Sequence, residues 1–150
     1  MTAVATTQPM AARLDAYCRA AAAQPFDWAT HNCCHFAGGW VRLVEGVDPL
    51  AGMPRLAGAR DARRLVRWLG GLAEAVTLRL EREPIAPARA RLGDVVLLPL
   101  SRIGGGHGNC VGICVGPSAA LGAQVAMYLT EAAAVYWPVA EASHAWALRT

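Results

Sequence analysis

Two adjacent cysteines, Cys33 and Cys34, stand between His31 and His35 in the segment "THNCCHFAGGWV", just before an apolar helical pattern. A thiol in the first turn of a helix faces unpaired backbone amides and the positive end of the helix dipole, which both favour thiolate over thiol. Such a thiolate can act as a nucleophile if a distant strand supplies an imidazole that shuttles protons. The two thiols could also be metal ligands or small core residues. A disulfide between them is not expected, because its geometry would be strained.

The remaining cysteines are Cys18, Cys110 and Cys114, which brings the total to five. An odd number of cysteines in a chain without an evident export signal argues against a disulfide framework. Helical spacing makes Cys18 a core residue, and Cys110 and Cys114 have the parity of two core residues on one strand face. A zinc or iron–sulfur site built from Cys33, Cys34, Cys110 and Cys114 is a further alternative. Neither Cys33 and Cys34 nor Cys110 and Cys114 are separated by the two residues that are usual between zinc or cluster ligands. We therefore expect no metal and no cofactor.

The elements that must position these thiols begin with helices. Periodic apolar residues predict helices over residues 10–23, from Asn32 or Cys33 to about residue 45, and over about residues 59–69. Gly46 should stop the second helix. Its buried face should be formed by residues at three- and four-residue spacing, namely Cys33, Ala37, Trp40 and Val44.

Short runs rich in Val, Tyr and Trp predict strands in the second half of the chain. They cover residues 93–100, 110–116, 124–130, 133–139 and 145–149, with a glycine-rich turn at 104–109. Helices followed by strands predict one α+β domain over residues 1–150 with an antiparallel sheet, and residues 1–9 should be extended.

Composition narrows the possible classes of function. Hydrophobic residues make up 55% of the chain and charged residues 17%, which is typical of a folded domain. No apolar run reaches the roughly 18 residues that span a bilayer, and the N-terminus lacks the pattern of a secretory signal. We therefore expect no membrane span and synthesis in the cytoplasm. The net charge of +3 is modest and its densest basic cluster, residues 58–68, is typical of a solvated helix face, so we expect no nucleic-acid partner.

Other aromatic and imidazole side chains have simpler interpretations. Trp28, Trp40 and Trp68 are expected to be core residues. His31 and His35 could tune Cys33, although a surface or hydrogen-bonding role is the better hypothesis. His144, near the C-terminus, should be exposed.

At this point the sequence resembles a known group of proteins. The segment "FDWATHNCCHFAGGWV", followed by "LGDVVLLPL" and "CVGICVG", is similar to the NlpC-type cysteine peptidases, a branch of the papain-like superfamily. It resembles more closely a small phage- and prophage-borne family of uncharacterised function. The similarity extends over roughly residues 12–149. It implies a papain-like fold in which N-terminal helices pack on a small antiparallel sheet.

The resemblance also implies site residues. The nucleophile of that group falls on Cys33, and its Gly-Asp pair falls on Gly93 and Asp94. Where the active peptidases begin a strand with histidine, this chain has Cys110, and the nearest imidazole is His107 in the glycine-rich turn. The supporting candidates are Asn109, Gln124 and Cys110.

These assignments lead to two functional hypotheses. In the favoured hypothesis, the chain is a tail-tip or assembly component of a phage or prophage and is located in the virion tail. Its partners are other tail proteins, and its peptidase site is degenerate. In the alternative, Cys33 and His107 form an active peptidase or amidase that cuts peptidoglycan stem peptides during cell-wall penetration.

Overall fold

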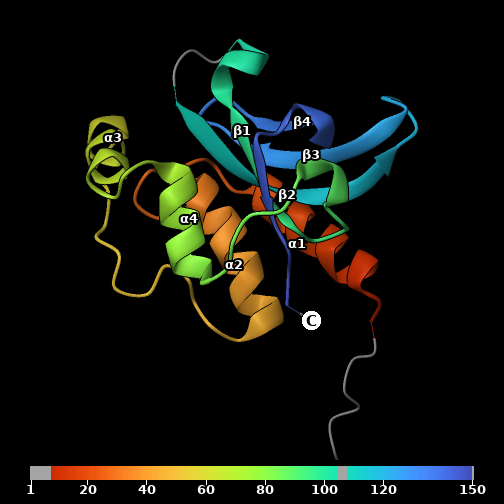
Figure 1. The fold of residues 1–150 in the computed structure, drawn as a ribbon, viewed down its shortest axis with the longest axis horizontal. Helices are drawn as coiled ribbons and strands as arrows, with labels where there is room; N and C mark the ends of the chain where they lie inside the picture. Colours follow the sequence, from red (N-terminus) through yellow and green to blue (C-terminus); the bar gives the residue numbers. More distant parts are fainter. Residues whose placement is uncertain (1–7, 105–107, 150) are drawn as a thin grey trace, which may run out of the picture.

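The computed structural model describes residues 8–104 and 108–149, which form an α+β fold (Figure 1). The N-terminal half of the described chain is helical and the C-terminal half builds an antiparallel sheet, as the sequence predicts. The helices are α1 (Met10–Ala23), α2 (Cys33–Glu45), α3 (Ala59–Trp68) and α4 (Leu72–Leu80). The strands are β1 (Val95–Pro99), β2 (Asn109–Ser118), β3 (Ala123–Leu129), β4 (Ala134–Pro138) and β5 (His144–Trp146). Single 3₁₀ turns lie at η1 (Pro87–Arg89), η2 (Leu100–Ile103) and η3 (Val139–Glu141).

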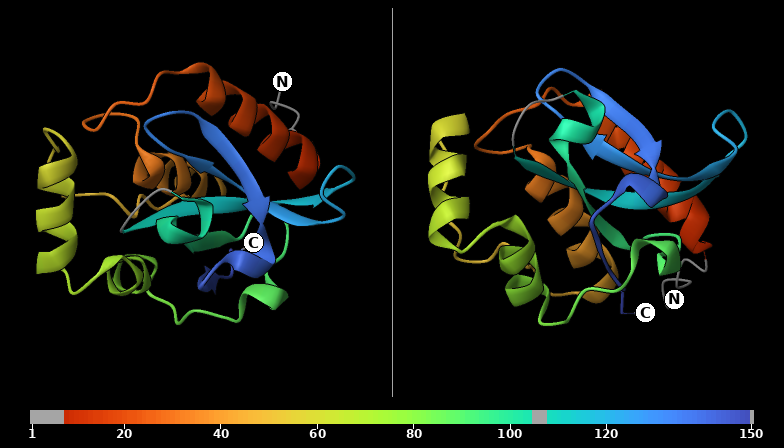
Figure 2. Two further views of the ribbon diagram at one scale, coloured as in Figure 1. Left: turned by 90° about the horizontal axis from the view of Figure 1, so that it is seen from above. Right: turned by 45° about the horizontal axis from the view of Figure 1, so that its top comes forward.

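The five-stranded sheet has the order β4-β3-β2-β1-β5, and every neighbouring pair is antiparallel. The strand β2 is therefore central, and its first residues pair with the end of β1, where Cys110 lies opposite Leu98. Side chains from α1 and α2 form a core with one face of the sheet, and Figure 2 shows α1 lying along that face. The opposite face carries a second apolar cluster that includes Cys110, Cys114 and Tyr128.

The helix α2 is anchored on the sheet by Trp40, which is completely buried. The Trp40 Nε1–H donates a hydrogen bond of 3.0 Å to the backbone oxygen of Gly93, just before β1. Ala37 is also buried, and Val44 is partly buried against the same core. The predicted packing face of α2 is thus confirmed. Its C-terminus is confirmed as well, because Gly46 has the left-handed φ of 79° that ends a helix.

Two features of the middle segment differ from the sequence prediction. The helix α3 buries no side chain and lies at the margin of the molecule in each view (Figures 1 and 2). The prediction that Trp68 belongs to the core is wrong, since 83% of it is exposed. The helix α4 is not anticipated by the sequence pattern, although its Leu72, Ala75 and Leu80 are buried.

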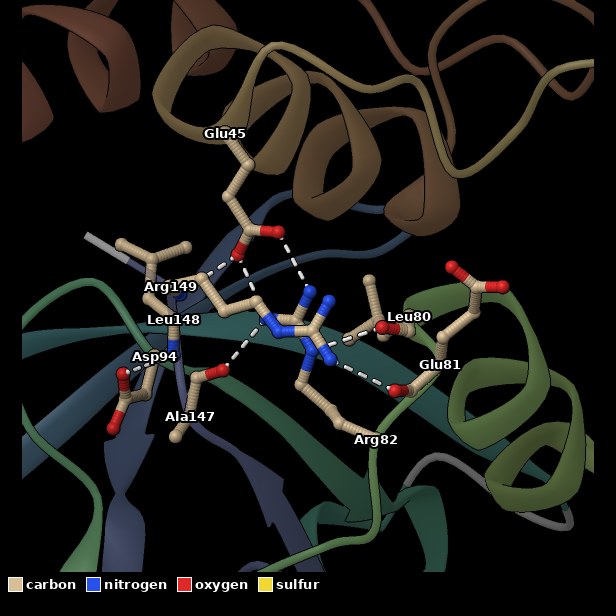
Figure 3. Close-up of polar contacts among 8 residues, drawn as sticks. All are labelled: Glu45, Leu80, Glu81, Arg82, Asp94, Ala147, Leu148 and Arg149. Carbon is tan, nitrogen blue, oxygen red and sulfur yellow. Dashed lines mark hydrogen bonds and ion pairs between the residues drawn. The ribbon is translucent and has the colours of Figure 1, made fainter.

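A buried ion pair ties α2 to the segment that follows α4 (Figure 3). The Arg82 guanidinium donates to both carboxylate oxygens of Glu45 at 2.6 and 2.7 Å, and both side chains are about nine-tenths buried. Arg82 also donates to the backbone oxygen of Ala147, and the Arg149 backbone N–H donates to Glu45. These bonds hold residues 147–149, called the C-terminal strap below, against the end of α2. Among the described residues, no helix is both long and apolar enough to cross a membrane.

Candidate functional site

The start of α2 is built by a capping box. The Asn32 side chain is buried and its Oδ1 accepts hydrogen bonds from the backbone N–H groups of Cys34 and His35, at 2.9 and 3.0 Å. In return, the Asn32 N–H donates to Nδ1 of His35 at 3.3 Å. The Asn32 amide also donates to the backbone oxygen of Trp28. These bonds fix the first turn of the helix, so Cys33 is held as its first residue.

Cysteines from α2 and β2 approach one another at this helix terminus. Cys33 packs against both core clusters, and the second cluster contains Cys110 at the place where β2 begins. The thiol of Cys110 donates hydrogen bonds to the backbone oxygens of Leu129 and Val111, at 3.5 and 3.7 Å. All three cysteines are free thiols; Cys33 and Cys34 are half-buried, whereas Cys110 is buried.

The neighbouring cysteines Cys34 and Cys110 lower the pKa of Cys33, so that negative charge is favoured on its sulfur. Hydrogen bonds from the thiols of Cys110 and Cys34, followed by the Val111 and Cys33 backbone groups, hold the pKa of Cys33 well below its usual 9.0 despite burial. The pKa values of Cys110 and Cys34 are raised well above 9.0, chiefly because each is hydrogen-bonded to Cys33. The arrangement therefore favours the thiolate form at Cys33 over the thiolate forms of Cys34 and Cys110.

The two histidines beside the thiols have structural bonds of their own. Nε2 of His31 is 2.8 Å from the backbone oxygen of Ala21, and Nδ1 of His35 accepts the Asn32 N–H. Burial and the charge of His31 lower the pKa of His35, so this imidazole is neutral at pH 7. Hydrogen-bonding roles, rather than proton transfer to Cys33, are what the structure shows for both.

The other two histidines do not complete the site in the described structure. His144 is half-buried in the edge strand β5, not exposed as expected, because its ring stacks on Trp146 at a centroid distance of 5.8 Å. Its Nδ1 is 2.8 Å from the Ser143 hydroxyl. His107, the predicted imidazole partner of Cys33, lies outside the described residues.

The two supporting polar candidates lie at opposite ends of the β2–β3 strand pair. Asn109 is exposed at the start of the strand, next to Cys110 and paired with Pro99. Gln124 pairs with Pro117 near the opposite end, and its Oε1 accepts a 3.8 Å hydrogen bond from the thiol of Cys114. A strand rises about 3.3 Å per residue. Gln124 is therefore not brought to Cys33, which corrects that part of the expectation.

The same geometry bears on the metal hypothesis. Cys110 and Cys114 do share one face of β2, as predicted, but they are four positions apart along the strand, which is roughly 13 Å. The four cysteines Cys33, Cys34, Cys110 and Cys114 therefore do not converge. Within residues 8–104 and 108–149, no group of three or more His, Cys, Asp or Glu side chains is arranged to hold a metal ion.

The Gly-Asp pair before β1 has a structural role. The buried carboxylate of Asp94 accepts hydrogen bonds from the backbone N–H groups of Arg91 and Leu148, at 2.8 and 2.9 Å (the Leu148 bond is drawn in Figure 3). Gly93 supplies the carbonyl that binds Trp40, and its φ of 89° favours glycine. The pair thus joins α2 and the C-terminal strap to the sheet.

A surface hollow of about 590 Å³ lies beside the loop that precedes α2. Nothing in the sequence pattern singles out this hollow, because its walls come from three separate loops. Asp27 on its rim is held by hydrogen bonds to the backbone N–H groups of Ala29 and Thr30. The lining residues are Phe26, Asp27, Trp28, Ala29, Arg55, Leu56, Ala57 and Glu131.

Fold and site together define an α+β protein with a cysteine of lowered pKa at the junction of a helix terminus and the central strand of an antiparallel sheet. A family model described as a domain of unknown function, DUF6950, matches residues 7–148, and the chain belongs to this family. No curated protein matches the chain. No solved structure matches it either.

Proposed function

We propose that the chain is an NlpC-like domain of a phage or prophage tail, which acts as a tail-tip or assembly component and carries a degenerate peptidase site. The observation that carries this proposal is the identity of the group in contact with Cys33. At the strand position where the resemblance to the active peptidases implies a histidine, this chain has Cys110, which belongs to the apolar cluster against which Cys33 packs.

A cysteine in place of this histidine removes the proton donor that amide cleavage requires. A leaving amine must be protonated, and a positioned proton donor typically accelerates such a step by about 10²–10⁴-fold. The neutral thiols of Cys110 and Cys34 have raised pKa values and are poor proton donors near pH 7. A Cys33 thiolate in this setting is stabilised, but the hydrogen bonds found for the described histidines go to Ala21, Asn32 and Ser143 and not to Cys33.

The helix α3 supports a role in assembly. It presents Arg60, Arg63, Arg64 and Arg67 to solvent next to the exposed Trp68. Between α3 and residues 54–56 lies a mainly apolar groove of about 490 Å³, whose lining includes Trp68. Aromatic and arginine side chains are enriched in the parts of interfaces that contribute most to binding. The partner that fits this surface is a tail protein with an apolar side chain for the groove and acidic residues for the arginines.

Complementation of a phage that lacks this gene tests the assembly role. Cys33→Ala should restore normal particle numbers, whereas Trp68→Ala combined with Arg64→Glu should reduce them at least tenfold. The α3 variant should keep the wild-type circular dichroism spectrum, because α3 buries no side chain. Assembly that fails with Cys33→Ala and proceeds with the α3 variant would contradict the proposal.

A specific observation favours the alternative of a cysteine peptidase or amidase. The thiolate of Cys33 is stabilised at a helix N-terminus, which is the state that a nucleophile needs. Cys33 would attack an amide carbonyl of a peptidoglycan stem peptide, backbone amides would stabilise the oxyanion, and His107 would protonate the leaving amine.

Purified protein and isolated peptidoglycan distinguish the two functions. Hydrolysis that is abolished by Cys33→Ala and by His107→Ala, but not by His144→Ala, would establish the enzyme and overturn the degenerate site. Under the favoured proposal, the wild-type protein and all three variants release no new amino groups above background.

A further inference from the structure

We propose that the hollow before α2 and the groove beside α3 are the two halves of one binding surface for an extended segment of a partner protein, in which a basic, an apolar and an acidic side chain follow one another. The inference rests on the proposed assembly role of α3 and names the segment that this surface binds. It also adds a second half to the interface, because the proposed function leaves the hollow before α2 without a role.

The two halves have a common wall. Arg55 and Leu56 line both the hollow of about 590 Å³ and the groove of about 490 Å³. These two residues belong to the irregular segment between α2 and α3, and no backbone–backbone hydrogen bond is found for either of them among the described residues. Their N–H and C=O groups are available to the main chain of an incoming peptide. Extended peptides bind in this way, with alternate side chains in pockets.

The walls of both halves are held in place by hydrogen bonds within the chain. In the loop before α2, the backbones of Asp27 and His31 pair with each other at 2.8 and 3.0 Å, and the Trp28 oxygen accepts a bond from the capping residue of α2. On the other side, Asp61 accepts a 3.0 Å hydrogen bond from the Ala57 N–H. A preformed surface loses little conformational freedom on binding, which favours affinity.

The hollow before α2 fits a cationic side chain. Asp27 and Glu131 are exposed residues of its lining, and these two carboxylates outnumber the guanidinium of Arg55 on the shared wall. Phe26 and Trp28 form an edge-to-face pair in the lining, with ring centroids 4.9 Å apart. Carboxylates attract a cation, and aromatic rings bind both the charged head and the apolar stem of a Lys or Arg side chain.

The α3 side has the opposite charge. Arg64 lines the groove, and Arg60, Arg63 and Arg67 are exposed on the same helix. Asp61 is the acidic residue of the lining, and its carboxylate already accepts a backbone hydrogen bond. Acidic side chains of the segment therefore fit on this side, where a guanidinium can bind a carboxylate through two parallel hydrogen bonds.

The groove itself takes the apolar side chain. Leu56 on the shared wall and Leu65 and Trp68 of α3 form its apolar lining. Removing this surface from water supplies affinity, whereas exposed ion pairs contribute little each and mainly fix the orientation of the segment. The order along the surface is therefore basic before α2, apolar in the groove and acidic at α3.

Selection from a library of random twelve-residue peptides displayed on yeast, with the full-length protein as bait, tests this order. Enriched peptides should contain a basic residue, an apolar residue two to four positions away and an acidic residue beyond it, in either chain direction. Fluorescence anisotropy with a synthetic copy of an enriched peptide then gives the dissociation constant. Selection that enriches no motif, or a motif with another order of charges, would overturn the proposal.

Charge reversal in the protein and in the peptide locates the basic end. Glu131→Arg should weaken binding at least fivefold, and a peptide whose basic residue is replaced by glutamate should regain that affinity. Trp68→Ala should weaken binding at least tenfold. Glu83→Arg is the matched control, because it makes the same change at an exposed residue outside both halves and should alter binding less than twofold. Equal losses from the two charge reversals, or no rescue by the altered peptide, would refute the hollow as the basic end.

Phage complementation separates this inference from the proposed function. Glu131→Arg should reduce particle numbers as the α3 variant does, whereas Glu83→Arg should restore them. If the α3 variant fails and Glu131→Arg assembles normally, the assembly role stands and the two-part surface is refuted. If both variants assemble normally although the peptides bind in the expected order, the surface is supported and its role in assembly is refuted.

Discussion

At the scale of single residues, the ionisation of Cys33 depends on its neighbours more than on its position in the chain. The helix terminus supplies a favourable field, but the largest contribution to the lowered pKa comes from Cys110, which is distant in sequence. Cys18 shows the opposite case. Burial and the charge of Asp15 raise the pKa of Cys18 to about 11, so two cysteines of one chain differ strongly in reactivity.

The pH dependence of alkylation tests this difference. Iodoacetamide should label Cys33 fastest at pH 7, with a half-maximal rate at a pH well below 9.0, because the pKa of Cys33 is lowered whereas those of the other cysteines are raised. Cys110→Ala removes the strongest hydrogen-bond donor and should move the midpoint up towards 9.0. Mass mapping of each cysteine gives the rates, with Cys18 as the internal slow control. A Cys33 profile that is identical in wild type and Cys110→Ala would contradict the thiol cluster.

At the scale of elements, α1 and α2 are joined by Tyr17. Its hydroxyl donates a 2.6 Å hydrogen bond to the backbone oxygen of Phe36, and its ring stacks on Phe36 and packs against Trp40. Space for the hydroxyl exists because residue 39 is glycine. A Cβ at Gly39 would lie 2.5 Å from the Tyr17 oxygen, closer than carbon and oxygen atoms can approach.

A double-mutant cycle tests this contact. Gly39→Ala should destabilise the protein by about 1–3 kcal/mol through overpacking. Tyr17→Phe removes the hydroxyl and should cost about 1 kcal/mol by itself. In the double variant the added methyl has room, so the combined loss should be smaller than the sum of the two. Urea denaturation provides the free energies of unfolding, and strict additivity would show that the two groups do not meet.

At the scale of the whole molecule, the ion pair between Glu45 and Arg82 joins α2, the segment after α4 and the C-terminal strap. Burial alone would raise the pKa of Glu45. The hydrogen bonds and charges of Arg82 and Arg149 outweigh it, so the pKa is lowered from the usual 4.5. A carboxylate whose folded pKa is depressed stabilises the fold at pH values above its unfolded pKa. That contribution is lost as the pH falls through the lowered folded pKa.

Acid titration of stability tests the ion pair. Glu45→Gln should lower the free energy of unfolding at pH 7 by about 3 kcal/mol, because it leaves a buried guanidinium without its counter-charge. The difference from wild type should shrink as the pH falls from 4.5 through the lowered folded pKa, because the wild-type carboxylate then also becomes neutral. Asp15→Asn is the matched control, since the Arg19–Asp15 pair is 80% and 63% exposed. This control should change stability by less than about 0.5 kcal/mol. Equal losses in both variants would contradict a special role for Glu45.

The sequence by itself determined the features that arise from neighbouring residues. The apolar period of residues 33–45, the capping asparagine and Gly46 were sufficient to predict both ends of α2. Alternation in "CVGICVG" was sufficient to place Cys110 and Cys114 on one face of β2. These signals act within one helical turn or a few strand residues, so no knowledge of the fold is required to interpret them.

Only the tertiary structure decided which of these groups meet. It brought Cys110 to Cys33, separated Gln124 from both, and made Asp94 a clamp for the C-terminal strap. The exposure of Trp68 could not be inferred from α3 either, because an amphipathic pattern does not reveal whether another element covers its apolar face. Contacts of this kind depend on how segments far apart in the chain pack together. The thiol cluster therefore exists only once α2 has docked on the central strand of the sheet.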